Sequence, residues 1–192
     1  CNLILAWRKH LFGATLEPQM SWFAQSSDDA NPPRRFITDG SIEAAKIRRF
    51  LEEGRTIIVP CEEGKEREYI DNDPFLKESI ELDETSGDPP RDVMTAVEAK
   101  GLDLDQVVVY GFGDYAVNEN LVDGLFHPPS EESDERVEHS YFLNRLYVAL
   151  SRARTDLIVI DSPTGNQKLW KELDDIDYIA GETGFPVRPE HA

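Results

Sequence analysis

The segment "NRLYVALSRARTDLIVID", residues 144–161, decides the fold because a helix pattern passes directly into a strand pattern. Its apolar residues recur at the i, i+3, i+4, i+7 spacing of one helix face: Leu143, Leu146, Tyr147 and Leu150. This spacing predicts a helix over 141–152. The run "LIVI" at 157–160 is continuously apolar, which is typical of a strand covered on both faces of a parallel sheet. Two permanent cations, Arg152 and Arg154, lie between these two core elements.

Other short apolar runs of the same kind precede this segment. They are "NLILA" (2–6), "TIIVP" (56–60), "VMTAV" (93–97) and "VVVY" (107–110). Helical patterns fall between or after the runs, at 41–54, at 65–80 with a break near Pro74, and at 166–176. Strands that alternate with helices predict an α/β fold with a mostly parallel sheet and right-handed crossovers.

Four stretches are expected to lack regular structure. Residues 26–35 and 84–92 are polar with a proline pair each, residues 111–138 form a long acidic connection, and residues 177–192 form a C-terminal tail. In open parallel sheets, ligands bind outside the carboxyl ends of the strands. We therefore expect the chemistry of the protein just after Val97 and just after the helix that carries the arginines.

The net charge of −18 comes almost entirely from the middle of the chain. Residues 61–138 hold 6 lysines and arginines against 23 aspartates and glutamates, whereas residues 1–60 hold 8 against 7 and residues 139–192 hold 6 against 8. One interpretation of this acidic segment is a solvated face or an adaptation of the whole proteome to high salt. The other is a surface that repels nucleic acid or docks a basic partner. The charge alone does not indicate DNA binding.

The composition also excludes several classes of protein. No apolar run approaches the roughly 20 residues of a membrane-spanning helix, so no membrane association is expected. Two cysteines and four histidines show no metal-ligand spacing, so we expect no metal site, and a reducing cytoplasmic location fits best. The 192 residues are expected to form a single domain, 1–192. Because the chain begins at Cys1, we expect a fragment of a longer protein, with a lipid-modified cysteine as the alternative.

The stretch "TAVEAKGLDLDQVVVY", residues 95–110, places charged residues on a turn between two predicted strands. Gly101 allows a close backbone approach or a positive φ. Lys100 and Asp103 present opposite charges from the same turn. The turn is either a ligand-binding loop or a solvent-exposed turn with an ordinary ion pair.

The arginines of the first segment also have two interpretations. Arg145 and Arg152 are seven residues apart and so face the same way on a helix. Arg152 lies near the helix C-terminus, where the macrodipole favours a cation by about 0.3–1 kcal/mol. It is therefore either a capping arginine or a guanidinium that faces a phosphate.

Taken together, the two stretches resemble the C-terminal motor half of superfamily 1 DNA helicases, the UvrD/Rep/PcrA group. That family has T-x-H-x-x-K-G-L-E-F/W-x-x-V, followed by L-Y-V-A-x-T-R-A-x-x-x-L, where this chain has "TAVEAKGLDLDQVVVY" and "LYVALSRARTDLIVI". The resemblance covers roughly residues 93–161. It implies a RecA-like three-layer sandwich of the P-loop NTPase type.

The resemblance also assigns roles toward the nucleotide. Arg152 occupies the position of the arginine finger that reaches the γ-phosphate of ATP bound by the other motor domain. Arg8, after Trp7, is the candidate for a second catalytic arginine. Lys100, Gly101 and Asp103 occupy the nucleotide-contacting turn, in which Asp103 replaces the family's ribose-binding glutamate.

Thr95 and Val97 occupy the positions that contact single-stranded DNA in the family. Val97 replaces a histidine there, which weakens the expected contact. The sequence has no G-x-x-x-x-G-K-[ST] phosphate loop. The resemblance therefore implies that ATP and Mg²⁺ are bound mainly by an N-terminal domain outside this chain, and that residues 1–192 alone are inactive.

Two hypotheses follow. In the first, the chain is the second RecA-like domain of an ATP-dependent helicase that moves along single-stranded DNA. In the second, it is a degenerate helicase-like module, which is kept for protein contacts and uses the acidic region 61–138 to hold a basic partner or to regulate the motor.

Overall fold

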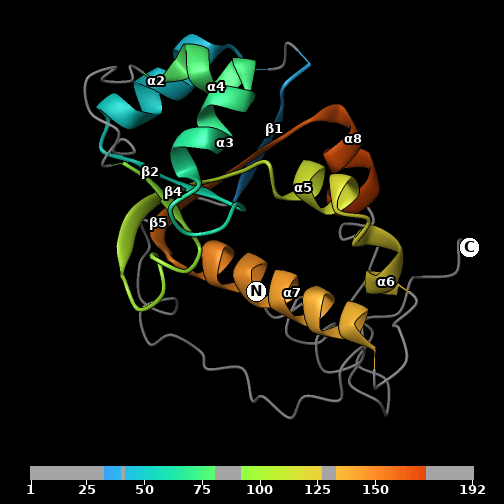
Figure 1. Ribbon diagram of the computed structural model, residues 1–192. Helices are drawn as coiled ribbons and strands as arrows, with labels where there is room; N and C mark the ends of the chain where they lie inside the picture. Colours follow the sequence, from blue (N-terminus) through green and yellow to red (C-terminus); the bar gives the residue numbers. More distant parts are fainter. Residues whose placement is uncertain (1–32, 40–41, 81–91, 127–132, 172–192) are drawn as a thin grey trace, which may run out of the picture.

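A parallel β-sheet forms the centre of the computed structural model, which describes residues 33–39, 42–80, 92–126 and 133–171 (Figure 1). The strands are β1 (Arg34–Ile37), β2 (Thr56–Val59), β3 (Val93–Thr95), β4 (Leu104–Tyr110) and β5 (Ala153–Asp161). Their order in the sheet is β1-β5-β4-β2-β3, and every neighbouring pair is parallel. Four of the five strands coincide with predicted apolar runs, and the run 2–6 lies outside the described residues.

Helices cover both faces of this sheet (Figure 1). They are α2 (Ala44–Glu52), α3 (Glu66–Asn72), α4 (Pro74–Ser79), α5 (Phe112–Asn118), α6 (Val122–Phe126), α7 (Asp134–Ser151), α8 (Pro163–Gly165) and the π-helix η2 (Asn166–Trp170). Successive strand residues point to opposite faces, so Val108 packs with α2, α3 and α4, whereas Val107 and Val109 pack with α5, α7 and η2. The predicted fold class, a three-layer α/β sandwich with a parallel sheet, is confirmed, and the arrangement is consistent with a RecA-like fold.

The helices predicted for 41–54, 65–80 and 141–152 are present with shifted ends. The helix predicted for 166–176 is a π-helix over Asn166–Trp170, and residues 172–176 lie outside the described residues. Residue 41, where the first predicted helix begins, lies outside the described residues, and α2 begins at Ala44 without a side-chain cap. The predicted break near Pro74 is confirmed, because Asp73 ends α3 and caps α4 by accepting a hydrogen bond of 2.9 Å from the Leu76 amide. The helix predicted for 141–152 begins earlier, at Asp134, behind the N-cap Ser133.

The prediction of an irregular loop over 111–138 was wrong. That segment contains α5, α6 and the first turn of α7. Helix α5 buries Phe112 and Ala116 completely, and its first amides are capped by the carboxylate of Asp161, which lies far downstream in the sequence. The acidic charge of this segment is evident from its own residues. The cap that allows the short helix to form is not, because it comes from a residue that is distant in the sequence.

The prediction that residues 26–35 form a loop was wrong at its end, because Arg34 and Arg35 begin strand β1. Two adjacent arginines disfavour a strand on propensity alone. The guanidinium of Arg34 donates hydrogen bonds of 2.7 and 2.9 Å to the buried carboxylate of Asp156 on β5. This ion pair, together with the pairing of β1 with β5, accommodates the charge at an edge strand.

Candidate functional site

Arg152 is the first residue after α7 and immediately precedes β5. Its guanidinium donates one hydrogen bond of 3.3 Å to the main-chain carbonyl of Leu102 and one of 3.0 Å to the hydroxyl of Ser151. The side chain is half-buried, and its Nε atom is buried without a partner. Among the described residues, no carboxylate forms an ion pair with it. Both partners are neutral, so its positive charge is not compensated locally.

The site that contains Arg152 lies at the amino ends of the strands. Leu104 and Ala153, the first residues of β4 and β5, are opposite each other, and the Leu104 amide donates to the carbonyl of Arg152 at 3.1 Å. The expectation that the helix with the arginines leads to chemistry at the carboxyl edge was therefore wrong for Arg152. A helix that precedes a parallel strand must end at the amino edge of the sheet.

The turn between β3 and β4 brings the other nucleotide-site candidates to Arg152. Gly101 has a φ of +84°, in the left-handed region that favours glycine, and the next residue, Leu102, presents its carbonyl to Arg152. Lys100 and Asp103 flank these two residues and are exposed. In the described part of the chain, neither of them forms an ion pair, so the alternative of an ordinary Lys100–Asp103 ion pair does not hold.

The candidates for DNA contact lie at the opposite end of that turn, where Thr95 is the last residue of β3 and Val97 follows two residues later. Thr95 is completely buried and forms a capping box with Glu98. The Glu98 carboxylate accepts 2.7 Å and 3.0 Å hydrogen bonds from the amide and hydroxyl of Thr95, and the Thr95 hydroxyl accepts a 3.3 Å hydrogen bond from the Glu98 amide. Val97 is 38% exposed. The structure thus brings Arg152 together with residues 100–103, but not with Thr95, and Arg8 lies outside the described residues.

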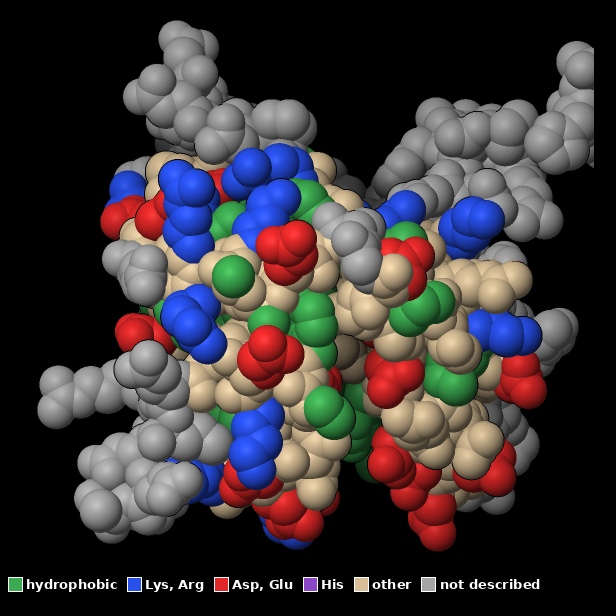
Figure 2. Space-filling model, turned by 90° about the horizontal axis from the view of Figure 1, so that it is seen from above, with side chains coloured by type: hydrophobic (Ala, Val, Ile, Leu, Met, Phe, Trp, Pro, Cys, Tyr) green, Lys and Arg blue, Asp and Glu red, His purple; other side chains and the backbone are tan. Residues whose placement is uncertain are grey.

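A cleft that the sequence did not predict opens at the carboxyl edge of the sheet, with a volume of about 660 Å³ (Figure 2). One wall comes from the end of β2 and from α3, and the other from α5; the lining residues are Cys61, Glu62, Lys65, Glu68, Tyr69, Asn72, Asp73, Pro74, Asp114, Tyr115, Asn118 and Glu119. The neighbouring strands β2 and β4 lead to helices on opposite faces of the sheet. Such a switch point is where open α/β sheets bind ligands.

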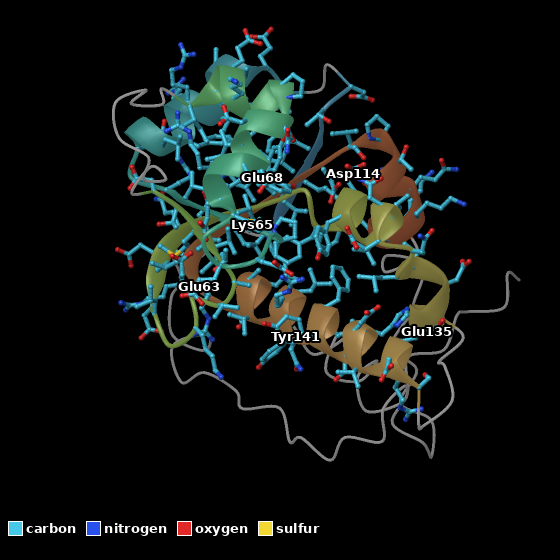
Figure 3. All side chains as sticks on the ribbon, viewed as in Figure 1. Glu63, Lys65, Glu68, Asp114, Glu135 and Tyr141 are labelled. Carbon is cyan, nitrogen blue, oxygen red and sulfur yellow. The ribbon has the colours of Figure 1, made fainter. Side chains whose placement is uncertain are left out.

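The cleft is strongly acidic. Five of its lining residues are carboxylates, against the single cation Lys65. Figure 3 shows Lys65 and Glu68 on the α3 side and Asp114 on the α5 side. Burial raises the pKa of the Cys61 thiol to about 12, with the nearby Glu66 carboxylate adding to the shift, so this thiol stays protonated at neutral pH. Burial also raises the pKa of Tyr69 well above its usual value, with Asp73 adding to the effect.

Arg145 connects α7 to the floor of this cleft. Its guanidinium donates hydrogen bonds of 3.2 Å to the Cys61 carbonyl and 3.1 Å to the Tyr115 hydroxyl. The residue is only 7% exposed. The sequence predicted that Arg145 and Arg152 face the same way, but they reach different edges of the sheet, because Arg145 contacts the carboxyl end of β2 and Arg152 contacts the turn before β4.

Asp161 holds the neighbouring corner of the carboxyl edge together. Its carboxylate, which is 1% exposed, accepts hydrogen bonds from the amides of Gly113 (2.6 Å), Asp114 (2.9 Å) and Ser162 (2.9 Å) and from the indole of Trp170 (2.7 Å). Burial raises the pKa of Asp161 even though all four donors favour the charged form. We therefore assign Asp161 a structural role, because its four N–H donors link the end of β5 to α5 and to η2.

The described residues contain no group of three or more His, Cys, Asp or Glu side chains placed to hold a metal ion. Within the same residues, no helix has the length and apolar character to cross a bilayer.

The comparisons with known proteins are sparse. No family model matches the chain, and no curated protein matches it. Among solved structures, the chain is similar to the C-terminal domain of a possible DNA helicase from Lactobacillus plantarum WCFS1. The identity is 18%, over 86% of this chain and 90% of that chain, with a TM-score of 0.37. This likeness is distant, so a functional assignment depends on the residues themselves.

Proposed function

We propose that this chain is the second RecA-like motor domain of an ATP-dependent DNA helicase of the superfamily 1 type, and that Arg152 is its arginine finger. The observation that carries the proposal is the hydrogen bond between Arg152 and the carbonyl of Leu102. This bond joins the two sequence stretches that resemble the helicase motifs, although they are 50 residues apart. One surface at the amino edge of the sheet therefore presents Arg152 together with Lys100, Gly101 and Asp103.

The contacts of Arg152 suit a side chain that changes its hydrogen-bond partners during the catalytic cycle. A carbonyl and a hydroxyl are neutral acceptors, whereas hydrogen bonds from arginine to phosphate are charge-assisted and roughly twice as strong. In the proposed cycle, the guanidinium leaves Leu102 when the ATP-bearing domain closes on this one. It then stabilises the charge that develops on the transferred phosphoryl group.

The remaining nucleotide contacts are proposed for the same turn. Lys100 and Asp103 are exposed on either side of Gly101 and Leu102, where they can meet the ribose or the phosphates of the bound ATP. The described residues offer no cluster of metal ligands, so the proposal assigns Mg²⁺ to the N-terminal domain, which would also supply the phosphate loop. In the proposal, residues 1–192 alone hydrolyse no ATP.

For single-stranded DNA, the proposal gives Thr95 and Val97 different roles. Thr95 is buried and holds the turn through Glu98, whereas Val97 is exposed at the carboxyl end of β3 and is available for contact. Thr95 therefore supports the track, and the exposed surface around Val97 forms part of it.

The test is the substitution Arg152→Ala in the full-length protein, with Arg154→Ala as the matched control. Arg154 is on the same segment, and its guanidinium lies 3.9 Å from the exposed carboxylate of Asp105. Loss of an arginine finger lowers the turnover of ATP by about 10³-fold or more with little change in ATP affinity. Arg154→Ala is expected to leave turnover near the wild-type value. An Arg152→Ala protein with normal turnover would rule the finger out.

A second candidate function is favoured by the acidic cleft. Glu62, Glu68 and Glu119 are exposed on its walls, and a cleft lined by one sign of charge concentrates ligands of the opposite sign. The chain would then be a helicase-like module that holds a basic segment of a partner protein.

The two candidates are separated by titration with an octa-arginine peptide. The module predicts salt-sensitive binding that weakens in the double variant Glu62→Gln, Glu68→Gln. Glu135→Gln is the control, because this residue is exposed on α7 away from the cleft lining (Figure 3). Equal affinities in all three proteins would remove the module from consideration.

A further inference from the structure

A tyrosine–arginine–tyrosine stack lies beside the acidic cleft. The guanidinium carbon of Arg145 is 5.3 Å from the ring centre of Tyr115 and 5.0 Å from that of Tyr141. The Tyr115 ring also stacks on Phe142, with 6.3 Å between the centres and 12° between the planes. The stack is thus anchored in the core at one end, while Tyr141, at the other end, is 54% exposed (Figure 3).

The charge of Arg145 is unusual for a purely structural contact. Among the described residues, no carboxylate pairs with this buried guanidinium, and its Nε atom is buried without a partner. A buried charge without a counter-ion is costly. The two hydrogen bonds that Arg145 donates, to a carbonyl and to a hydroxyl, could be made by a neutral side chain. What a neutral side chain could not supply is the cation–π interaction that fixes an exposed aromatic ring in place.

The stack occupies the part of the fold that suits a ligand. Arg145 contacts Cys61, which follows β2, and Tyr115, and both of these residues also line the cleft at the switch point. The ring of Tyr141 does not line the cleft itself, but it packs on Arg145, which donates to two residues that do. A large aromatic ring that is held rigid and half-exposed offers a flat stacking face at low entropic cost.

We propose that the exposed face of Tyr141 is a stacking platform for one base of single-stranded DNA, and that Arg145 positions the ring. This inference rests on the proposed function, since it names a contact between the motor domain and its DNA strand. Base–aromatic stacking tolerates any sequence, because every base has a π-face. The platform thus suits a motor that moves along DNA irrespective of sequence.

The surrounding charge limits how the strand lies. The cleft carboxylates repel phosphates, so the sugar–phosphate backbone runs outside the cleft and only the base reaches the ring. A contact of this kind releases no counterions. Loss of the ring therefore lowers affinity by the same factor at low and at high salt, unlike the loss of a lysine–phosphate contact.

The experiment measures binding of a fluorescein-labelled oligothymidylate to the full-length protein and to three variants. Tyr141→Ala is expected to weaken binding by roughly 5- to 150-fold, the range of one base–aromatic stack. Tyr141→Phe keeps the ring and is expected to bind within about 2-fold of wild type. Val137→Ala is the control, because Val137 is 68% exposed one turn earlier on α7 and has no ring. A strand that carries 2-aminopurine should be quenched by every protein that keeps the ring, which excludes only Tyr141→Ala.

Each outcome bears on one claim. Wild-type affinity in Tyr141→Ala overturns the stacking platform and leaves the proposed function intact. Equal losses in the Ala and Phe variants also overturn stacking, because the hydroxyl would then be the contact. A loss for Tyr141→Ala that shrinks at high salt contradicts the base-only contact. Absence of binding by the wild-type protein in the presence of ATP would remove the proposed function and the platform together.

Discussion

The guanidinium of Arg152 lies 3.3 Å from the main-chain carbonyl oxygen of Leu102, and this one hydrogen bond connects the end of α7 to the turn before β4. The adjacent backbone bond, from the Leu104 amide to the Arg152 carbonyl, fixes the same two segments in register. Arg152 is therefore aligned by the sheet itself. The proposed finger would need this kind of support, because catalysis by a finger depends on position more than on affinity.

The turn that receives Arg152 depends on Gly101. A Cβ at this position meets nothing within 4 Å, so Gly101→Ala adds no clash, and its φ of +84° costs about 1–2 kcal/mol in any L residue. We expect a thermal unfolding measurement to show this loss. We also expect ATP turnover of the full-length protein to fall, because a strained turn displaces Lys100 and Asp103, the proposed contacts to ATP.

Gly64→Ala is the matched control for this substitution. Gly64 has a φ of +81° and equally open surroundings, but it lies in the loop after β2. It should lose about the same stability, on the order of 1–2 kcal/mol, without loss of turnover. Equal turnover in both variants would contradict the role given to the turn.

Asp156 should make the protein sensitive to acid. Burial alone would raise the pKa of this carboxyl, but the hydrogen bonds from Arg55 and Arg34 outweigh burial and hold the pKa below its usual value. A lowered folded-state pKa contributes stability that is present above the unfolded-state pKa of about 3.9 and is lost as the pH falls through the folded-state pKa. Denaturant unfolding between pH 5 and pH 2 should show this loss, with a smaller slope in Asp156→Asn.

The same network predicts a large effect of substitution at neutral pH. Asp156→Asn removes the buried counter-ion of Arg55 and leaves only the more exposed carboxylate of Glu53 beside that guanidinium. We therefore expect a loss of up to about 3 kcal/mol, the lower end of the cost of breaking a buried ion pair. Asp105→Asn, which removes the exposed partner of Arg154, is the control and should change stability by less than about 1 kcal/mol. Similar losses in the two variants would show that the Asp156 network is not what holds β1 to β5.

Asp161→Asn tests the four hydrogen bonds that the Asp161 carboxylate accepts at the carboxyl edge of the sheet. Each carboxylate oxygen accepts from two N–H donors, Oδ1 from Asp114 and Ser162 and Oδ2 from Gly113 and Trp170. An amide in either orientation points its NH₂ group at two donors and leaves them unsatisfied. We expect a loss of about 2–6 kcal/mol in the free energy of unfolding, from two buried donors at 1–3 kcal/mol each.

The pH dependence of Asp161 has the opposite sign to that of Asp156. Because its folded-state pKa is raised, its contribution is fully present below the unfolded-state pKa and is lost as the pH rises through the folded-state pKa. Relative to wild type, Asp161→Asn should therefore be most destabilised at acid pH. A difference that grows with rising pH would contradict the raised pKa.

The apolar runs of the sequence predicted most of the sheet because strands buried on both faces are recognisable without their neighbours. Strand β1 was missed because the charge of Arg34 is compensated by Asp156, 122 residues later. Helix α5 was missed for a related reason, since its cap comes from Asp161. In both cases the deciding partner is distant in sequence, and local patterns carry no trace of it.

The candidate site, too, was predicted only in part from the sequence. The motifs predicted that Arg152 and the Lys100–Asp103 turn belong together, and the hydrogen bond to Leu102 joins them. The cleft was not predicted, because its walls come from segments that carry no motif and meet only through the strand order β4-β2. The proposed role of Tyr141 was not predicted either, because this residue also lies outside the motifs. The prediction of the sheet edge at which Arg152 lies was also wrong. That edge depends on whether the helix that carries the residue precedes or follows its strand.

The central claim is that Arg152 acts on the transferring phosphoryl group, and the most direct measurement compares two nucleotides on the full-length protein. ADP with aluminium fluoride mimics the transition state, and a non-hydrolysable ATP analogue mimics the ground state. A finger predicts that Arg152→Ala binds the transition-state mimic at least about 10³-fold more weakly than wild type, while the ATP analogue binds within a few-fold. Equal changes for both nucleotides, or no change for either, would contradict it.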